Sequence, residues 1–303
     1  MVAHHRVSRT GPLAPVGCPE KPRGASRTVE ASSQTRGSKA QTTIGDVLRW
    51  LSSLARDSYP EDGLYRGSPS TPLTGILLCW FANAGAREAA LRHNLNLIVT
   101  HETPFFETPS RDPGCPPPAD WLANKQTAAF YDNHGIAVAR YHRTLDAFCI
   151  PRAVGAHLGF PPPSVHEGHK GYEFTLVYDL EPTPFEQLAR QVKEKMKLPA
   201  IRLSAGDGRR TVRRVGLGWG GVSLSANLQY MELLRQHGAE VIIGGEVDEY
   251  ALEYYRESGM DWIELGHYAT EAIGLEQVAR ELGATFASTP LLCHKDSQRL
   301  VFL

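Results

Sequence analysis

The chain has 303 residues, enough for one large or two ordinary domains with a substantial buried core, which excludes a mini-protein. Hydrophobic residues make up 42% and charged residues 21%, values typical of soluble globular chains, so wholesale disorder and a fibrous architecture are excluded. The 32 basic and 33 acidic residues give a net charge of −1, which offers no electrostatic reason to expect nucleic acid or an anionic membrane as a partner.

The cysteines and the hydropathy pattern point to a reducing compartment. Five cysteines are an odd number, are widely scattered and never form a Cys-x-x-Cys pair, which argues against a disulfide framework and a thiolate zinc site. No stretch approaches 18 consecutive apolar residues, and the N-terminus lacks the apolar core of a secretory signal. We therefore expect a cytoplasmic protein that does not cross a membrane.

Residues 1–41 differ in composition from the rest of the chain. They contain seven Lys and Arg but two Glu, a net charge of +5, and are rich in Ser, Thr, Gly and Pro. Such a segment buries too little apolar surface to offset the entropy of ordering. An organellar transit peptide is the alternative, but the segment has no amphipathic periodicity, and we expect a disordered basic tail.

Helix and strand patterns alternate in the first half, which we place at residues 42–160. Apolar residues at helical spacing from Ile44 to Leu54 predict a first helix, and the apolar run 76–81 predicts a strand buried on both faces. The same reasoning predicts a helix at 83–93, a strand at 95–100, a helix at 121–134 and a strand at 136–141.

The alternation resumes after a connecting segment, residues 161–211, in which we expect a strand at 172–178 and a helix at 184–197. In the second half, residues 212–303, we expect a strand at 212–217, a helix at 225–237, a strand at 240–244, a helix at 249–258, a strand at 260–265 and a final helix. The chain is therefore predicted to form an α/β fold of two halves with mainly parallel central sheets.

The two halves share an approximate internal repeat. In the first half a strand leads to Trp80, a helix follows, and the next strand ends at Glu102. In the second half a strand leads to Trp219, a helix follows, and the next strand ends at Glu246.

The repeat continues as a His-x-x-x-carboxylate motif after a further strand in each half. His142 precedes Asp146 in the first half, and His267 precedes Glu271 in the second. The offset between halves falls from 139 residues at the tryptophans to 125 at these histidines. The repeat therefore predicts pseudo-twofold related halves, with chance similarity between two α/β units as the alternative.

Five residues form a candidate metal site. His267 and Glu271 are four apart on a predicted helix and so face the same side, while Asp146 and the pair His101-Glu102 follow buried strands. Nitrogen and carboxylate ligands together suit a hard or borderline divalent cation, and five ligands suit two ions bridged by a carboxylate. The alternative is that these side chains only cap helices or face solvent.

Four motifs resemble those of the NIF-three-like family of dinuclear-metal hexamers, often called GTP cyclohydrolase I type 2 homologues. They are Leu97-Ile-Val-Thr-His-Glu102, Tyr141-His-Arg-Thr-Leu-Asp-Ala147, Val241-Ile-Ile-Gly-Gly-Glu246 and Gly266-His-Tyr-Ala-Thr-Glu271. The resemblance implies a homohexamer in which each subunit binds two metal ions. The family's ligand positions fall on His101, Glu102, Asp146, His267 and Glu271.

Two positions depart from the family pattern. Many members have His-His where this chain has His101-Glu102, and a carboxylate in place of an imidazole shifts the preference from zinc towards manganese or ferrous iron. Family members also tend to have an Asp after the first strand, where this chain has Trp80-Phe81. Neither change removes a matched ligand.

Three further features have open roles. His142 is an auxiliary group that orients Asp146, a substrate-facing acid or a structural histidine. Glu246 holds a ligand, accepts a proton or favours the start of the next helix. The glycines at 216, 218, 220 and 221 form a tight loop without a GK[ST] or a full GxGxxG motif. A simple phosphate binder built on this loop is one functional hypothesis.

The leading hypothesis is a divalent-metal-dependent hydrolase that acts on a small phosphorylated or nucleotide-like molecule through a metal-activated water. The competing hypothesis is a non-catalytic hexameric scaffold that stores a cation or regulates a partner, with the same ligands but no open coordination position.

Overall fold

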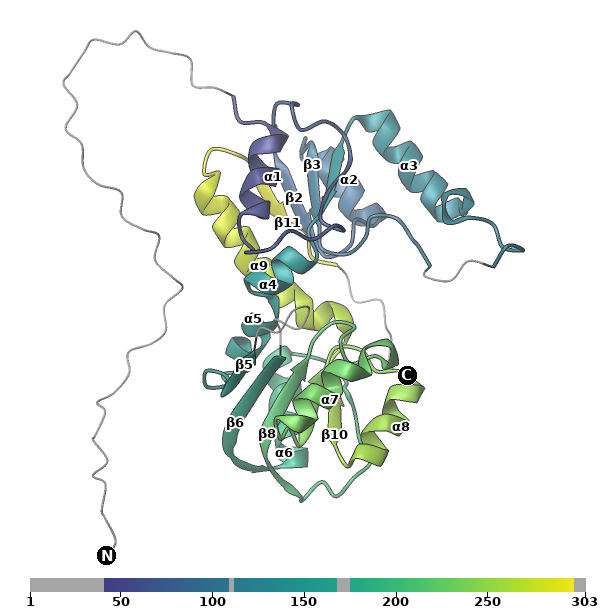
Figure 1. Cartoon of the computed structure of the whole chain (residues 1–303). Coiled ribbons are helices and arrows are strands. Elements are labelled where there is room, and N and C mark those ends of the chain that lie inside the picture. The colour runs from purple at the N-terminus through teal and green to yellow at the C-terminus, as the bar shows by residue number, and fades with distance from the viewer. Residues whose placement is uncertain (1–40, 109–111, 168–174, 297–303) are drawn as a thin grey trace, which may run out of the picture. The chain divides into compact units, whose positions relative to one another are not determined.

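A computed structural model describes residues 41–108, 112–167 and 175–296 (Figure 1). The predicted disordered tail at 1–41 lies outside the described residues except for Gln41. Among the residues of these three ranges, no helix has the length and apolarity needed to span a membrane.

The first sheet has the strand order β1-β4-β3-β2-β11. β2, β3, β4 and β11 run parallel, and β1 pairs with β4 antiparallel at the edge. Every residue of β2, β3 and β4 is buried, which explains why these strands are apolar without alternation. The bounds are β1 Gly63–Arg66, β2 Ile76–Cys79, β3 Leu97–Thr100, β4 Ala137–Arg140 and β11 Leu291–Cys293.

Helices cover both faces of this sheet. Val47 of α1 belongs to the same hydrophobic core cluster as Leu78, whereas Ala86 of α2 packs with Leu77, which points to the opposite face of β2. The Asn83 side chain accepts a hydrogen bond from the Ala86 amide and so begins α2. The helices are α1 Ile44–Ser52, α2 Ala84–Arg92, α3 Leu122–His134, α4 Arg143–Phe148 and α5 Ile150–His157, with a 3-10 turn η1 Pro118–Asp120.

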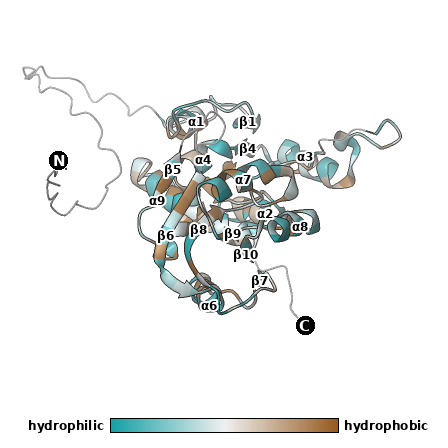
Figure 2. Ribbon diagram, turned by 60° about the horizontal axis from the view of Figure 1, so that its bottom comes forward, coloured by the Kyte–Doolittle hydropathy of each residue, from teal (hydrophilic) through white to brown (hydrophobic). Residues whose placement is uncertain are grey.

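The second sheet has the order β5-β6-β8-β9-β10-β7. Its central strands β8, β9 and β10 run parallel, and the flanking pairs β5-β6, β6-β8 and β10-β7 are antiparallel. The first four residues of β6 are buried and the later ones are not, so this strand changes from hydrophobic to hydrophilic along its length (Figure 2). The strands are β5 Val165–Glu167, β6 Thr175–Pro184, β7 Arg202–Leu203, β8 Thr211–Gly218, β9 Val241–Gly244 and β10 Asp261–Glu264.

Of the remaining helices, three lie between strands of this sheet along the chain and one follows its last strand. They are α6 Phe185–Met196, α7 Leu228–Gln236 after a 3-10 turn η2 Ser225–Asn227, α8 Glu249–Ser258 and α9 His267–Thr285. α9 also packs on α5, where Gly274 allows a close approach: a Cβ there would lie 2.6 Å from the Ile150 Cα. The chain then returns to the first sheet as β11, so segment 212–303 contributes a strand to the sheet of segment 42–160.

The predicted α/β fold is confirmed, with three corrections to element boundaries. The strand predicted at 76–81 ends at Cys79, so Trp80 and Phe81 lie beyond it. The helix predicted at 225–237 begins as a 3-10 turn. The strand predicted at 172–178 continues to Pro184, and its positions 172–174 lie outside the described residues.

The repeat read from the sequence has a structural counterpart. β2, β3 and β4 are neighbouring parallel strands in chain order, and so are β8, β9 and β10. The carboxyl ends of parallel strands meet at one edge of a sheet. Each half therefore gathers at one edge the residues that follow its three consecutive strands.

Candidate metal centre

The five predicted ligands all follow parallel strands. His101 and Glu102 come directly after β3, and Asp146 lies in α4 after β4. His267 begins α9 after β10, and Glu271 lies one turn further along the same helix. Residues that follow the carboxyl ends of parallel strands in both halves thus form the candidate site.

The structure brings these five side chains together. His101 Nε2 lies 3.8 Å from Asp146 Oδ1 and 3.5 Å from Glu271 Oε2. His267 Nε2 lies 3.2 Å from Glu102 Oε1 and 3.3 Å from Glu271 Oε2. The His267 and Glu271 side chains meet on one face of α9, as their i, i+4 spacing predicts.

His142 joins the group as a sixth candidate ligand. Its Nε2 lies 3.9 Å from Asp146 Oδ2, and its ring centroid lies 4.6 Å from that of His101. Two sets of possible ligand atoms lie within 4.8 Å of one another, His101 with His142 and Asp146, and His101 with Glu102 and Glu271. The sequence left the role of His142 open, although the repeat pairs it with His267.

His142 and His267, the two outer histidines of the cluster, face it with Nε2, and the Nδ1 atom of each contacts a further carboxylate. Glu61 Oε1 lies 2.8 Å from His142 Nδ1, and Glu246 Oε2 lies 3.0 Å from His267 Nδ1. Carboxylates placed in this way orient imidazole ligands and fix their tautomer in metal sites. Sequence reasoning raised this role for Glu246 but missed Glu61, which lies in a loop outside any recognisable motif.

A loop residue also fixes the helix that carries Asp146. Asp62 Oδ1 accepts the amide of His142 at 2.8 Å, and Asp62 Oδ2 accepts the amide of Thr144 at 2.9 Å. The Asp62 side chain thus satisfies two amides at the start of α4, although it is 80 residues away in sequence. No sequence pattern indicated this contact.

The centre of the cluster is buried and strongly charged. His101, Asp146 and Glu271 are 0%, 7% and 2% exposed, and neither ring nitrogen of His101 has a hydrogen-bond partner among the described residues. A buried polar group without a partner is rare and costly in a folded protein. An imidazole so placed between two carboxylates fits a divalent cation, which would satisfy its ring nitrogen and offset the negative charge.

The acidic surroundings shift the pKa values of the histidines. Burial alone would lower the pKa of His101, but the charges of Glu271, Asp146 and Glu102 outweigh it and raise the pKa to about 9. Burial is likewise outweighed at His267, where hydrogen bonds to Glu102, Glu246 and Glu271 raise the pKa to about 12. Without a metal ion, protons on these two rings add to the positive charge of the Arg140 guanidinium, which lies 4.0 Å from Glu102 Oε2.

A family model of Duf34/NIF3 (NGG1p interacting factor 3) matches residues 42–295. The chain belongs to this family. It is 24% identical over 269 residues to a protein of Clostridium acetobutylicum named "GTP cyclohydrolase 1 type 2 homolog", a match that covers 84% of this chain and 96% of that protein. A protein of Allochromatium vinosum with the same name is 24% identical over 255 residues, or 81% of this chain and 93% of the relative.

Solved structures share the fold. A Bacillus cereus protein related to NIF3 superposes with a TM-score of 0.68 at 14% identity, which covers 87% of this chain and all of that one. A Staphylococcus aureus protein gives a TM-score of 0.70 at 13% identity over 88% of this chain and all of that one. Similarity at this level of identity supports the α/β architecture.

The glycine loop of this Duf34/NIF3 chain, residues 216–221, packs against the cluster. Amides in and next to the loop donate hydrogen bonds to acceptors within the protein. The amide of Gly220 donates to Thr270 Oγ1 at 3.0 Å, and the amide of Val222 donates to the Trp219 carbonyl at 3.0 Å. Gly220 has a φ of +53°, and a Cβ there would lie 2.0 Å from Glu271 Oε1. The loop therefore makes room for Glu271, and the two amides named are not available to bind a phosphate.

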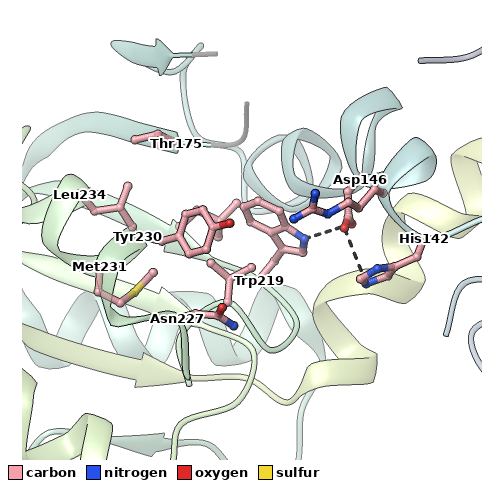
Figure 3. Close-up of a pocket in the computed structure, with 11 residues that line it drawn as sticks. His142, Asp146, Thr175, Trp219, Asn227, Tyr230, Met231 and Leu234 are labelled. Carbon is pink, nitrogen blue, oxygen red and sulfur yellow. Dashed lines mark hydrogen bonds and ion pairs between the residues drawn. The ribbon is translucent and has the colours of Figure 1, made fainter. Parts of the chain in front are cut away.

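A cavity of about 150 Å³ reaches the cluster from the side of Asp146. Figure 3 shows Trp219 between the polar end, where His142 and Asp146 lie, and the apolar end, where Met231 and Leu234 lie. Arg143 adds a cation to the lining, and Asn227 and Tyr230 add polar atoms. The volume is about that of a cavity that holds one benzene ring, which suits a small organic molecule.

Proposed function

We propose that this protein is a divalent-metal-dependent hydrolase with a dinuclear centre formed by His101, Glu102, Asp146, His267 and Glu271. Metal ions bound there would lower the pKa of a coordinated water and polarise a substrate oxygen. The observation that carries the proposal is the fully buried His101, whose ring nitrogens lack hydrogen bonds although two carboxylates lie within 4 Å of it.

The side chains divide into two similar groups around His101. Asp146 and His142 lie on one side, and Glu271, Glu102 and His267 lie on the other. In this arrangement His101 is within reach of both groups, and Asp146 and Glu271 would hold metal ions together with it. Glu246 and Glu61 hold the outer imidazoles in the orientation that ligation requires.

The donor set favours a hard or borderline cation. Imidazole and carboxylate groups make up the cluster, and Glu102 supplies oxygen where many relatives are expected to supply a second imidazole. We therefore propose manganese or ferrous iron ahead of zinc as the resident ion.

The cavity beside Asp146 supports a small substrate. Arg143 and the cluster itself lie at its polar end, where an anionic group such as a phosphate would be held, and Trp219 and Leu234 offer apolar surface for the rest of the molecule. The name of the curated relatives agrees with a nucleotide-like substrate. We accordingly propose a small phosphorylated compound as the substrate, or a nucleotide-like one of which this cavity would hold only a part.

Three further proposals concern the whole chain, and only the first of them comes from the resemblance. We propose that the chain assembles as a homohexamer, that it acts in the cytoplasm, and that its halves divide at residues 42–160 and 212–303 around the connecting segment 161–211. Sedimentation at micromolar concentration tests the first of these, with a sixfold multiple of 33.4 kDa as the expected mass.

A metal-binding scaffold without turnover is the second candidate. The near-complete burial of Asp146 and Glu271 favours it, because structural metal sites are closed whereas catalytic sites keep a position open to substrate. The cavity that reaches Asp146 favours the hydrolase.

Turnover of a panel of phosphomonoesters and nucleotides, with Mn²⁺, Fe²⁺ or Zn²⁺ added, decides between the two. The hydrolase requires metal-dependent product formation that is lost in Glu271→Gln and retained in Glu276→Gln. Glu276 is a matched control because it lies on the same helix but pairs with Lys295 at 2.6 Å. Stoichiometric metal without turnover of any compound would favour the scaffold.

Metal binding should release about two protons per chain at pH 7. His101 and His267, with pKa values of about 9 and about 12, are protonated in the metal-free protein and must lose a proton to bind a cation. Metal affinity should therefore rise with pH between 6 and 9. Titration calorimetry in two buffers of different ionisation enthalpy counts the protons, and a binding heat independent of the buffer would contradict this expectation.

A further inference from the structure

Two tryptophans occupy matching positions in the halves of the molecule. Trp80 is the first residue after β2, and Trp219 is the first residue after β8. β2 and β8 are the first strands of the two parallel sets, β2-β3-β4 and β8-β9-β10. Each tryptophan therefore lies at the carboxyl end of the first parallel strand of its half, at the sheet edge that supplies the cluster.

Each indole donates a hydrogen bond to a carboxylate of the other half. Trp80 Nε1 donates to Glu271 Oε2 at 2.6 Å, and Trp219 Nε1 donates to Asp146 Oδ1 at 3.2 Å. Glu271 follows β10 of the second half, whereas Asp146 follows β4 of the first. The exchange is reciprocal, and both acceptors are buried carboxylates of the proposed centre.

Trp80 has further contacts with ligand residues. Its ring packs edge-on against the His267 imidazole, with centroids 5.4 Å apart and planes at 68°. Its backbone carbonyl accepts the amide of Glu102 at 2.8 Å. One residue thus touches three of the five proposed ligands.

We propose that Trp80 and Trp219 are reciprocal positioning residues, each of which fixes a metal-binding carboxylate of the opposite half through its indole N–H. An indole N–H is a donor only, so it neither ligates the cation nor competes for it. It occupies one lone pair of one carboxylate oxygen and restricts rotation of the group, while the other lone pairs remain for metal ions. Neither half then has its carboxylate in the binding orientation without the tryptophan of the other half.

The inference rests on the proposed metal centre and is tested with Trp80→Phe and Trp219→Phe in the full chain. Phenylalanine keeps an aromatic ring but removes the donor. Partners of metal ligands typically contribute 10- to 100-fold in affinity, so we expect each variant to bind Mn²⁺ about 10- to 100-fold more weakly by competition with a chelator. Trp121→Phe is the matched control, because its indole donates at 2.9 Å to the Pro116 carbonyl away from the cluster.

A second measurement requires no folded Trp80 or Trp219 variant. The five tryptophans are labelled as 5-fluorotryptophan, and Zn²⁺ is added as a diamagnetic probe while the ¹⁹F spectrum is followed. We expect the resonances of Trp80 and Trp219 to shift on saturation and those of Trp50, Trp121 and Trp262 to stay in place. The resonances of Trp50, Trp121 and Trp262 are assigned with phenylalanine variants of these residues. The two remaining resonances then belong to Trp80 and Trp219.

The outcomes separate this inference from the proposed function. Metal binding by the wild type, with equal affinity in Trp80→Phe, Trp219→Phe and Trp121→Phe and with no selective ¹⁹F shift, would overturn the inference and leave the metal centre standing. A wild type that binds neither Mn²⁺ nor Zn²⁺ would overturn both. Weaker binding in the first two variants with unchanged unfolding of the metal-free protein would support positioning over a purely structural role.

Discussion

Replacing Glu271 by glutamine should abolish metal binding and destabilise the metal-free protein at neutral pH. The side chain is 2% exposed and lies 3.5 Å from His101 Nε2 and 3.3 Å from His267 Nε2. Although burial raises the pKa of Glu271, the charges of both histidines and the hydrogen bond from His267 outweigh it, so its pKa lies well below the usual range. Glutamine keeps the shape but removes the negative charge between the two imidazoles.

We expect the affinity for Mn²⁺ to fall by about 100-fold or more, since even partners of ligands contribute up to that amount. Breaking a buried charge pair costs about 3–5 kcal/mol, and this loss should shrink above pH 9, where His101 gives up its proton. Urea unfolding of the metal-free protein at pH 7 and pH 10 measures it. Glu276→Gln serves again as the control, and an unchanged affinity in Glu271→Gln would remove Glu271 from the centre.

The sign of this pH dependence follows from the direction of the shift. The pKa of His101 is raised from 6.5 to about 9 in the folded protein, so its charge contributes stability that is complete below pH 6.5. That contribution is lost as the pH rises through about 9. Bound metal replaces the proton, so the metal-loaded protein should not show the same loss.

Gly220→Ala is the second change with a large expected effect. A Cβ at this position would lie 2.0 Å from Glu271 Oε1 and 3.2 Å from His267 Nε2, and the backbone has a φ of +53°. The carboxylate must therefore move or the loop must shift. We expect about 1–3 kcal/mol of destabilisation, together with weakened metal binding.

Gly259→Ala separates the effect of the left-handed backbone from the effect of the clash with Glu271. Gly259 has a similar φ of +69°, but a Cβ there would have no neighbour within 4 Å. Alanine at 259 should cost about 1 kcal/mol for the left-handed backbone and leave metal affinity unchanged. Equal metal affinity in the two alanine variants, measured by chelator competition, would show that the loop does not shape the centre.

The sequence predicted the elements that carry the centre because their signals are local. β2, β3 and β4 are buried on both faces and so appear as continuous apolar runs, and α8 spans the same residues as predicted. Because the carboxyl ends of parallel strands meet at one edge of a sheet, the residues after those runs lie near one another.

The contacts that escaped prediction depend on long-range geometry. β11 is three residues long and pairs with β2 more than 200 residues earlier, a partnership that no local pattern encodes. Glu61 and Asp62 reach His142 and α4 from a loop, and the indoles of Trp80 and Trp219 cross between halves. The position of each tryptophan was visible in the repeat, but its acceptor was not.

The repeat also bears on His142, whose role the sequence left open. Its i, i+4 spacing to Asp146 is that of His267 to Glu271, and each of the two histidines has an outer carboxylate. The family pattern placed five ligands, whereas the described structure brings six candidate side chains together, His101 and five others. The comparison of the halves pairs His142 with His267 and so favours a ligand role for it as well.

The metal content of the purified protein tests the account most directly. The full chain is prepared without added metal or a polyhistidine tag, and metal per chain is measured by elemental mass spectrometry beside His267→Ala and Asp146→Ala. We predict about two divalent ions per wild-type chain, drawn from manganese, iron and zinc, and loss of metal in both variants. A wild type that is metal-free and cannot be reconstituted with any of the three ions would contradict the dinuclear centre.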